Sequence, residues 1–257
     1  MKFGGASVAT PEHFSRIADL ILSKKHKRLV IVASAMGNTT DQLIALAKEV
    51  NPDPPRREYD MLVTVGERIS ISLLAMALAR KGHEAVSYTG SQSGIITTPD
   101  HSDAKIIDVK PHRLLYSLNI GKIVIVAGFQ GVSTTGEITT LGRGGSDTTA
   151  VALGIALKAP RVEFYKDVPG IFDADPRLSP DSKKFSTLTY DEALTIVQRG
   201  AKVLHDRCLN LAKINNIPLY VSSFQEKHGE AGTWIKTSRK QSESTPTYEH
   251  QSLSRLD

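Results

Sequence analysis

A glycine-rich run near the middle of the chain is well suited to bind an anionic ligand. It reads Gly142-Arg143-Gly144-Gly145-Ser146-Asp147 and leads into an apolar, helix-like pattern. The first N–H groups of a helix have no partner within it, and flexible glycines leave them open to a phosphate or carboxylate. Arg143 adds a planar guanidinium that can bond such a group at two points. In a second interpretation, Ser146 or Asp147 merely caps the helix.

Two further segments could also approach a phosphate group. Near the N-terminus Gly4-Gly5 follows Lys2, so the backbone can lie close to a ligand whose charge the lysine neutralises. The stretch 166–177 mixes turn-forming residues with acids and an arginine. Taken alone, each segment also fits an ordinary turn.

The spacing of the glycines excludes two common nucleotide-binding motifs. The P-loop pattern G-x-x-x-x-G-K-[ST] does not occur in the sequence. Gly142 and Gly144 begin like the dinucleotide fingerprint G-x-G-x-x-G, but Asp147 stands at its third glycine position. An anion site here must therefore be of another kind.

The elements that would position these segments alternate along the chain. Short β-branched runs predict strands at 29–33, 86–88, 122–127, 161–165 and 218–222. Helical periodicity predicts helices at 12–23, 41–49, 60–80, 147–157, 190–198 and 206–214. This alternation predicts a mostly parallel sheet covered by helices. Small residues directly follow several strands, as at Ser34–Gly37 and Gly128–Gly131, where open α/β sheets bind their ligands.

Composition narrows the class of protein. The 257 residues are 40% hydrophobic and carry a formal net charge of +5, which allows one large α/β domain. The basic cluster Lys24–Arg28 is typical of a solvated helix end, and no nucleic-acid-binding motif accompanies it. No apolar run approaches the roughly 20 residues of a membrane span. With one cysteine, Cys208, and no metal-ligand spacing among the histidines, we expect a cytoplasmic enzyme.

Together these segments resemble the catalytic domain of aspartate kinases, within the amino acid kinase superfamily. They occur in the family's order at Lys2–Val8, Ser34–Asp41, Gly66–Arg68, Gly142–Thr149, Asp167–Arg177 and Gly200–His205. The resemblance covers residues 1–235 and implies a three-layer αβα sandwich of the carbamate kinase-like type with a mostly parallel central sheet. It also implies that MgATP phosphorylates the β-carboxylate of L-aspartate to 4-phospho-L-aspartate. This reaction is the first step toward lysine, threonine and methionine.

The resemblance implies catalytic roles for three charged residues. Lys2 and Lys202 would neutralise charge on the transferring phosphoryl group, and Asp147 would orient these lysines or support the metal. Because a carboxylate nucleophile is already ionised near pH 7, the reaction needs positioning and charge neutralisation but no general base. We assign no side-chain ligand to Mg²⁺ and expect ATP to carry it.

The resemblance also assigns residues to the amino acid substrate. Arg143 would bind a substrate carboxylate and Glu67 the α-ammonium, with hydrogen bonds from Thr40 and Ser146. Glu67 lies within an otherwise apolar helical pattern, where a carboxylate requires a cationic partner. Its neighbour Arg68 is a poor partner, since consecutive helix residues do not face each other.

The nucleotide would be held by two groups of residues. The resemblance places phosphate oxygens on the backbone N–H groups of Gly4 and Gly5, near Ser34, Lys2 and Lys202. The remaining ATP-binding residues implied by the resemblance are Lys166, Asp167, Phe172, Asp175 and Arg177. Lys166 departs from the threonine usual in the family, and Phe172 from a frequent tyrosine.

Aspartate kinases usually carry C-terminal ACT regulatory domains, whereas here a polar segment follows Ile235. We expect a catalytic domain at 1–235, its N-terminal part binding the amino acid and its C-terminal part the nucleotide. A flexible tail is expected at 236–257. The family implies a homodimer. The missing domains leave three alternatives open: no ACT-mediated feedback, regulation by a separate subunit, or a sequence that is a shortened form of a longer protein. The first strand is also shorter than in the family.

Two alternatives to an aspartate kinase stay open. The first is a related kinase for glutamate, N-acetylglutamate, carbamate or UMP, against which Glu67 and the Ser34–Asp41 run argue. The second is a catalytically weak paralogue that binds nucleotide as a regulatory or scaffold subunit. The phosphoryl-transfer residues Lys2, Asp147 and Lys202 argue against the second alternative, because a binding module does not need them.

Overall fold

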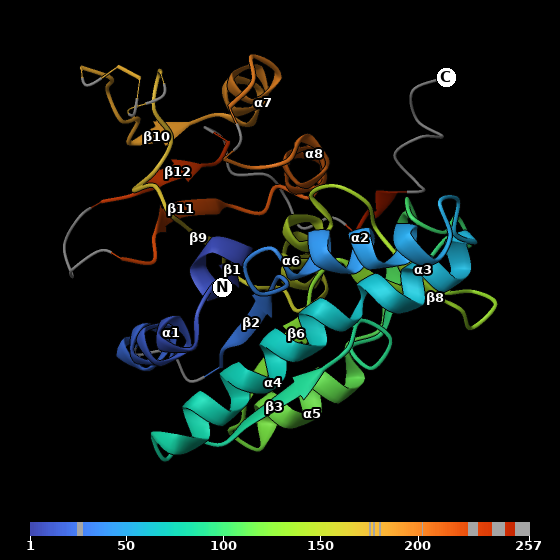
Figure 1. The fold of residues 1–257 in the computed structure, drawn as a ribbon. Coiled ribbons are helices and arrows are strands. Elements are labelled where there is room, and N and C mark those ends of the chain that lie inside the picture. Colours follow the sequence, from blue (N-terminus) through green and yellow to red (C-terminus); the bar gives the residue numbers. More distant parts are fainter. Residues whose placement is uncertain are drawn as a thin grey trace.

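An eight-stranded sheet forms the centre of the molecule (Figure 1). The computed structural model describes residues 1–24, 28–174, 176, 178–179, 181–201, 203–225, 231–237 and 245–249. The strand order is β10-β12-β11-β9-β1-β2-β6-β3, and every neighbouring pair is parallel except β11 and β12. The strands are β1 Lys2–Phe3, β2 Val30–Ala33, β3 Ala85–Tyr88, β6 Ile123–Ala127, β9 Val162–Lys166, β10 Thr187–Leu188, β11 Leu219–Ser223 and β12 Thr233–Ile235.

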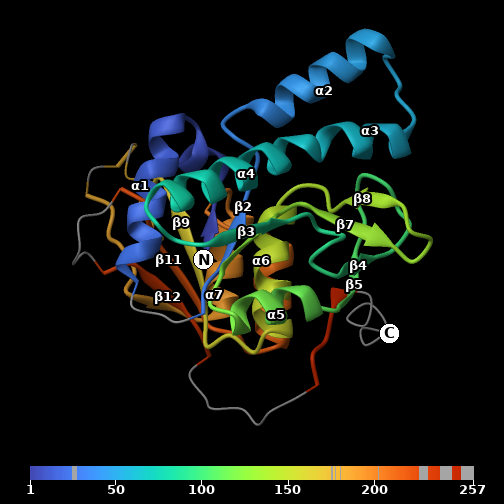
Figure 2. The same ribbon diagram turned by 90° about the horizontal axis from the view of Figure 1, so that it is seen from below.

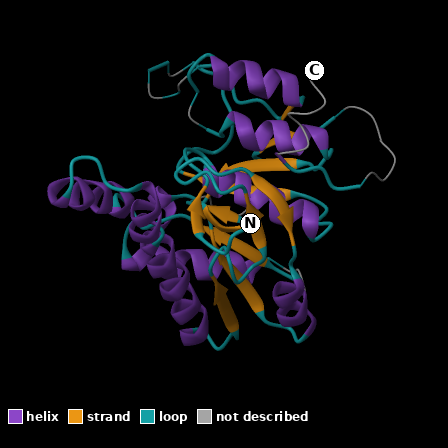
Figure 3. Cartoon of the chain, turned by 90° about the vertical axis from the view of Figure 1, so that its right-hand side faces the viewer, coloured by secondary structure: helices purple, strands orange, loops and turns teal. Residues whose placement is uncertain are grey.

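Helices cover both faces of this sheet (Figure 3). Along β2, Ile31 and Ala33 point into one apolar cluster and Val32 into the other, as the two-residue period of a strand requires. The first cluster is covered by α1 Pro11–Ser23 and α4 Val65–Arg80. The second is covered by α5 His112–Asn119, α6 Gly145–Ala156, α7 Tyr190–Gln198 and α8 Asp206–Ile214. The predicted three-layer αβα sandwich is thereby confirmed.

A helical hairpin and a small second sheet flank one end of the sandwich (Figure 2). The hairpin consists of α2 Thr39–Val50 and α3 Arg56–Val63. The second sheet has the order β5-β4-β7-β8. Its strands are β4 Ile95–Thr97, β5 Ile106–Val109, β7 Gln130–Ser133 and β8 Ile138–Thr140. None of these four strands was predicted.

The single helix predicted at 60–80 is wrong, because the chain divides at Thr64 into α3 and α4. The Gln130 side-chain amide donates to the Thr64 carbonyl at 3.1 Å and so competes for the acceptor that would continue the helix. By length and composition Arg56–Arg80 could cross a membrane. Its residues Leu74 and Leu78 are instead fully buried in the cluster beneath α1, as in a core helix.

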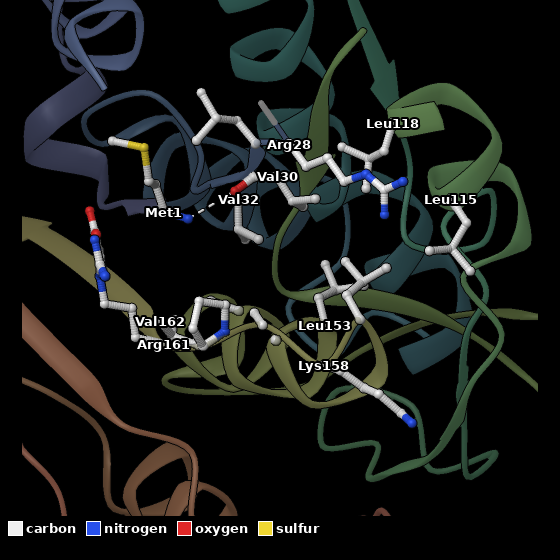
Figure 4. Close-up of a pocket in the computed structure, with 17 residues that line it drawn as sticks. Met1, Arg28, Val30, Val32, Leu115, Leu118, Leu153, Lys158, Arg161 and Val162 are labelled. Atoms are coloured by element: carbon white, nitrogen blue, oxygen red, sulfur yellow. Dashed lines mark hydrogen bonds and ion pairs between the residues drawn. The ribbon is translucent and has the colours of Figure 1, made fainter. Parts of the chain in front are cut away.

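A cavity of about 520 Å³ lies at the amino ends of the central strands (Figure 4). Because β1 has only two residues, it does not reach the amino ends of its neighbours β2 and β9 and leaves a space between them. The wall is mostly apolar, with Leu115, Leu118 and Leu153 among its residues. At its edge the Met1 amine donates to the Val30 carbonyl at 2.8 Å, and burial lowers the pKa of this amine to about 6.

Part of the segment expected to be a flexible tail packs against the body of the protein. Residues 245–249 lie beside β5 (Figure 2), and Tyr248 is 6% exposed within the larger apolar cluster. The backbone of Thr247 exchanges two hydrogen bonds, of 2.8 and 2.7 Å, with the side-chain amide of Asn215 at the end of α8. These five residues therefore differ from the expectation, because a buried aromatic ring and paired amides hold them in place.

Candidate active site

The carboxyl ends of four adjacent strands, β9, β1, β2 and β6, meet at one edge of the sheet. From β1 the chain proceeds to β2 and β6 on one side and later returns to β9 on the other, which is where α/β sheets bind ligands. A pocket of about 310 Å³ lies at this edge. It is lined by Lys2, Gly5, Ser34, Ala35, Gly37, Thr40, Glu67, Phe129, Gly142, Gly144, Gly145, Ser146 and Asp147.

A buried carboxylate between two lysines forms the floor of this pocket. Asp147 Oδ1 lies 2.6 Å from Lys2 Nζ, and its Oδ2 lies 3.2 Å from Lys166 Nζ. Burial alone would raise the pKa of Asp147, but the two ammonium groups outweigh it and hold that pKa below its usual range. Burial lowers the pKa of Lys2, although Asp147 opposes this shift. With two lysines and one carboxylate, the group has a formal net charge of +1, which suits an anionic ligand.

The parallel pairing of β1 with β9 brings these lysines together. Lys2 pairs with Phe164 and Phe3 with Tyr165, so Lys166 extends from the next position of the neighbouring strand. Asp147 reaches both from the first turn of α6. Lys166 was expected to contact nucleotide, but its bond to Asp147 was not anticipated.

The glycine-rich run forms the entry to α6. Gly142 and Gly144 have φ values of +69° and +72°, in the left-handed region that favours glycine. The helix begins at Gly145 with Gly144 as N-cap, so the interpretation of Ser146 or Asp147 as the cap is wrong. The carboxylate of Asp147 is engaged by lysines instead. The first-turn N–H groups consequently face the pocket without a side-chain cap, as an anion site requires.

Glu67 lies in the first turn of α4 and is 3% exposed. Its Oε1 accepts a hydrogen bond of 3.1 Å from the N–H of Ala35, at the end of β2. Among the described residues, Oε2 has no hydrogen-bond partner, although it is buried. Burial raises the pKa of Glu67 to about 7, against the opposing hydrogen bonds and the charge of Lys2. A buried, half-satisfied carboxylate in a pocket is suited to bind a cationic ligand group.

The loops after β1 and β2 are joined by their backbones. The N–H of Gly37 donates to the Gly5 carbonyl at 3.2 Å. A Cβ at Gly5 would lie 3.1 Å from the carbonyl oxygens of Ala35 and Gly37, so this approach needs glycine. Thr40 lines the same pocket from the start of α2.

The structure therefore brings together seven of the predicted site residues in one pocket, with Lys166 beside them. The pocket contains Lys2, Gly5, Ser34, Thr40, Glu67, Ser146 and Asp147, while Gly4 precedes Gly5 in the same turn. Arg143 is exposed and does not line the pocket, although both of its neighbours do. Asp167 and Phe172 lie on the chain that leaves β9. Asp175, Arg177 and Lys202 lie outside the described residues.

Phe129 lines the pocket but was not predicted as a site residue. Its φ is +69°, which is rare for an aromatic residue, and its N–H donates to Thr149 Oγ1 at 3.2 Å. The sequence signal was present, because Phe129 stands between Gly128 and Gly131 after a strongly predicted strand.

Comparisons with known proteins find a matching family and similar structures. The family model described as "Amino acid kinase family" matches residues 1–223. The chain is 50% identical over 237 residues to the aspartokinase of Bacillus sp. (strain MGA3), covering 91% of this chain and 57% of that protein. The chain thus spans little more than half the length of the curated relatives it matches.

Two solved structures share the fold and much of the sequence. Aspartate kinase from Synechocystis superposes with a TM-score of 0.83 at 44% identity, covering 95% of this chain and 40% of that one. E. coli aspartokinase III, solved in complex with aspartate and ADP, gives a TM-score of 0.84 at 30% identity. That match covers 93% of this chain and 64% of the other.

Proposed function

The chain belongs to the amino acid kinase family, and we propose that it transfers the γ-phosphoryl group of MgATP to the β-carboxylate of L-aspartate. The observation that carries the proposal is the pocket that joins Glu67 to the Lys2–Asp147–Lys166 group. Glu67 is a buried acceptor for an ammonium group, and the lysines suit a phosphoryl group. An amino acid and a nucleotide phosphate can therefore meet in one site. The similarity to aspartokinases supports aspartate as the amino acid.

In the proposed reaction, a β-carboxylate oxygen of aspartate attacks the γ-phosphorus of ATP. A new bond forms between that oxygen and phosphorus while the bond to the bridging oxygen of ADP breaks. The electron pair of the broken bond leaves with ADP, and the product is 4-phospho-L-aspartate. No proton is removed from the nucleophile, because a carboxylate is ionised near pH 7.

The side chains of this pocket would act by positioning and charge neutralisation. Lys2 and Lys166 would face the phosphoryl oxygens while Asp147 holds their ammonium groups in place. The N–H groups of Gly4 and Gly5 would bind phosphate oxygens beside Ser34. Lys202 is proposed as a further neutralising residue.

Magnesium is proposed to enter with ATP. Both oxygens of Asp147 already contact lysines, so this carboxylate is a poor candidate for a direct metal ligand. When bound, Mg²⁺ would neutralise charge shared between the β- and γ-phosphates. The residues of the pocket fit this arrangement, since their cationic groups remain available for the other phosphate oxygens.

Glu67 and three further residues would orient aspartate. Glu67 would accept the α-ammonium group on Oε2, and Thr40 and Ser146 would donate to substrate oxygens. Arg143 would bind a substrate carboxylate after turning inward from its exposed position. The segment that follows β9 would hold the nucleotide through Asp167, Phe172, Asp175 and Arg177.

Trapping of the acyl phosphate with hydroxylamine tests the proposed reaction. With ATP, Mg²⁺ and separate L-aspartate, L-glutamate, N-acetyl-L-glutamate and carbamate arms, we expect product in the aspartate arm, with stoichiometric ADP. Product from another carboxylate alone would assign a different substrate. Saturable ATP binding without product in any arm would favour the regulatory or scaffold alternative. A UMP arm that forms UDP would identify a nucleotide kinase.

Gly128→Ala is expected to impair the site through α6. A Cβ at Gly128 would lie 2.7 Å from both Cβ and Oγ of Ser146, so the start of α6 must move. Overpacking of this kind costs about 1–3 kcal/mol. Because about 1.4 kcal/mol corresponds to a tenfold change in affinity, we expect KM for aspartate to rise by about fivefold or more, measured in the hydroxamate assay.

Gly154→Ala, a substitution within α6 itself, provides a matched control. A Cβ there would lie 2.6 Å from Val162 Cγ2, in the core rather than at the pocket. It should lower the melting temperature similarly while KM for aspartate stays within about twofold, the effect expected of uncoupled distant sites. Equal KM values in both variants would contradict the assignment of Ser146.

A further inference from the structure

The side chain of Arg207, at the start of α8, joins three separate parts of the chain. Its Nη1 donates to the carbonyl of Leu141 and to Asp103 Oδ1, the latter at 3.3 Å. Its Nη2 donates to the carbonyl of Ala104 at 3.0 Å. Nε and Nη2 also bond Glu249, at 2.7 and 3.0 Å. The five N–H groups of the guanidinium thus have five acceptor contacts.

Glu249 completes this arrangement from the segment 245–249. Its side chain is 11% exposed, and the side chain of Arg207 is 16% exposed. Its Oε2 also accepts a hydrogen bond of 2.8 Å from the N–H of Ile106, the first residue of β5. A bidentate, largely buried pair of this kind fixes the plane of the guanidinium. Tyr248 and the Thr247–Asn215 bonds anchor the same segment.

The carbonyl held by Arg207 belongs to the residue that precedes the glycine-rich run. Leu141 is fully buried, and its N–H donates to the carbonyl of Phe129, which lines the pocket. The next residue, Gly142, packs against the turn at 102–103, where an added Cβ would lie 3.0 Å from Asp103 Oδ1. Arg207 therefore holds both Leu141 and the turn beneath Gly142.

Helix α8 touches the same run at a second point. Its N-cap, His205, lies against Gly144, where an added Cβ would come within 2.2 Å of the His205 ring. Movement of the first turn of α8 would therefore displace Gly144 as well as Leu141. These contacts lie two and five residues before Ser146.

We propose that Arg207 and Glu249 are positioning residues, through which the segment 245–249 sets the place of the substrate-binding run 142–147. Without Glu249, the guanidinium loses two of its five acceptor contacts and can rotate away from Leu141. The run that carries Arg143 and Ser146 then becomes less ordered. The kinetic part of this inference rests on the proposed aspartate kinase activity, whereas its structural part does not.

Glu249→Gln and Glu249→Ala test the kinetic part in the full chain. Loss of a charged hydrogen bond in a largely buried pair leads us to expect a rise in KM for aspartate of about tenfold in the Gln variant. The Ala variant should show a larger rise. In both variants, KM for ATP should change by a smaller factor than kcat/KM for aspartate, because the run 142–147 is proposed to contact the amino acid.

Amide hydrogen exchange tests the structural part without any activity. We expect residues 141–147 to exchange faster in both Glu249 variants than in the parent chain, and Arg207→Lys to do the same because it loses the planar fork. Asp191→Asn is the matched control. It breaks a 2.5 Å contact with Lys213 near the other end of α8 and should leave the exchange of 141–147 unchanged.

The two readouts separate the possible failures. Unchanged exchange at 141–147, together with faster exchange at 245–249, would overturn the inference and make the segment a mere cover. If the parent chain forms no acyl phosphate, the proposed function fails while the exchange result still decides the coupling. KM for aspartate and KM for ATP could instead rise equally while amide exchange becomes faster by the same factor throughout the chain. That result would indicate general destabilisation and would also overturn the inference.

Discussion

Asp147→Asn is expected to lower kcat for acyl phosphate formation by about 10²- to 10³-fold, as loss of one preorganised electrostatic group does in other enzymes. The substitution removes the carboxylate that lies 2.6 Å from Lys2 and 3.2 Å from Lys166. The two ammonium groups would then repel each other and leave the positions in which they face the phosphate. The hydroxamate assay at saturating aspartate and ATP measures this loss.

The same variant is expected to unfold more easily, because breaking a buried ion pair costs about 3–5 kcal/mol. Urea denaturation followed by circular dichroism gives that free energy and shows whether the kinetic assay was made on folded protein. Glu163→Gln is the control. Glu163 lies on β9, as Lys166 does, and is 8% exposed. It accepts hydrogen bonds from Arg161 and Tyr165 but does not line the active-site pocket.

The control should lose stability and keep kcat within about threefold, as expected of a site that is not coupled to the chemistry. If folded Asp147→Asn retains full kcat, the Lys2–Asp147–Lys166 group is not the phosphoryl-transfer centre. Equal kcat losses in both variants would point to general damage of β9 instead.

Glu67→Gln is expected to reduce kcat/KM for aspartate by roughly 30-fold or more, since a buried charge pair lost at a binding site costs about 2 kcal/mol or more. The amide keeps an oxygen for the Ala35 N–H but offers no anionic partner to the ammonium group of aspartate. Initial rates over a range of aspartate concentrations measure the effect. The binding of ATP, followed by calorimetry, should change little.

The pH profile gives a second test of Glu67. The pKa of Glu67 is raised to about 7 by burial, so kcat/KM for aspartate should rise as the pH increases through 7 and the carboxylate ionises. In Glu67→Gln this inflection should disappear. A profile that is flat between pH 6 and 8 in the parent chain would contradict the assigned role.

The linked effect on stability has the opposite sign. Above pH 4.5 unfolded Glu67 has lost a proton that the folded protein retains until about pH 7, so stability falls across this window. The fall amounts to at most about 3 kcal/mol. It should be absent in Glu67→Gln and unchanged in Glu58→Gln, an exposed acid on α3.

Local patterns were sufficient to predict much of the central sandwich. Strands buried on both faces are continuous apolar runs, and the segment predicted at 122–127 is β6 at Ile123–Ala127. The helices predicted at 190–198 and 206–214 coincide with α7 and α8, because their apolar period is regular and their starts carry capping residues. The eight-residue helix α5 was missed, since so short an amphipathic segment has a weak pattern.

Elements that depend on distant partners could not be predicted. The four strands of the second sheet have three or four residues each, and their pairing is decided by the packing of distant segments. The division of one predicted helix at Thr64 depends on Gln130, which is 66 residues away. The packing of 245–249 likewise depends on Arg207 and Asn215 in α8.

The sequence by itself determined the chemistry available to this protein: glycines that let backbone approach a phosphate, and the charged residues Lys2, Glu67 and Asp147. Such features are local, because residue type and spacing along the chain define them. Only the tertiary structure decided which charges meet. The bonds of Asp147 to Lys2 and Lys166, and that of Glu67 to Ala35, follow from the strand order β9-β1-β2-β6. That order results from packing the whole chain, so no single segment encodes it.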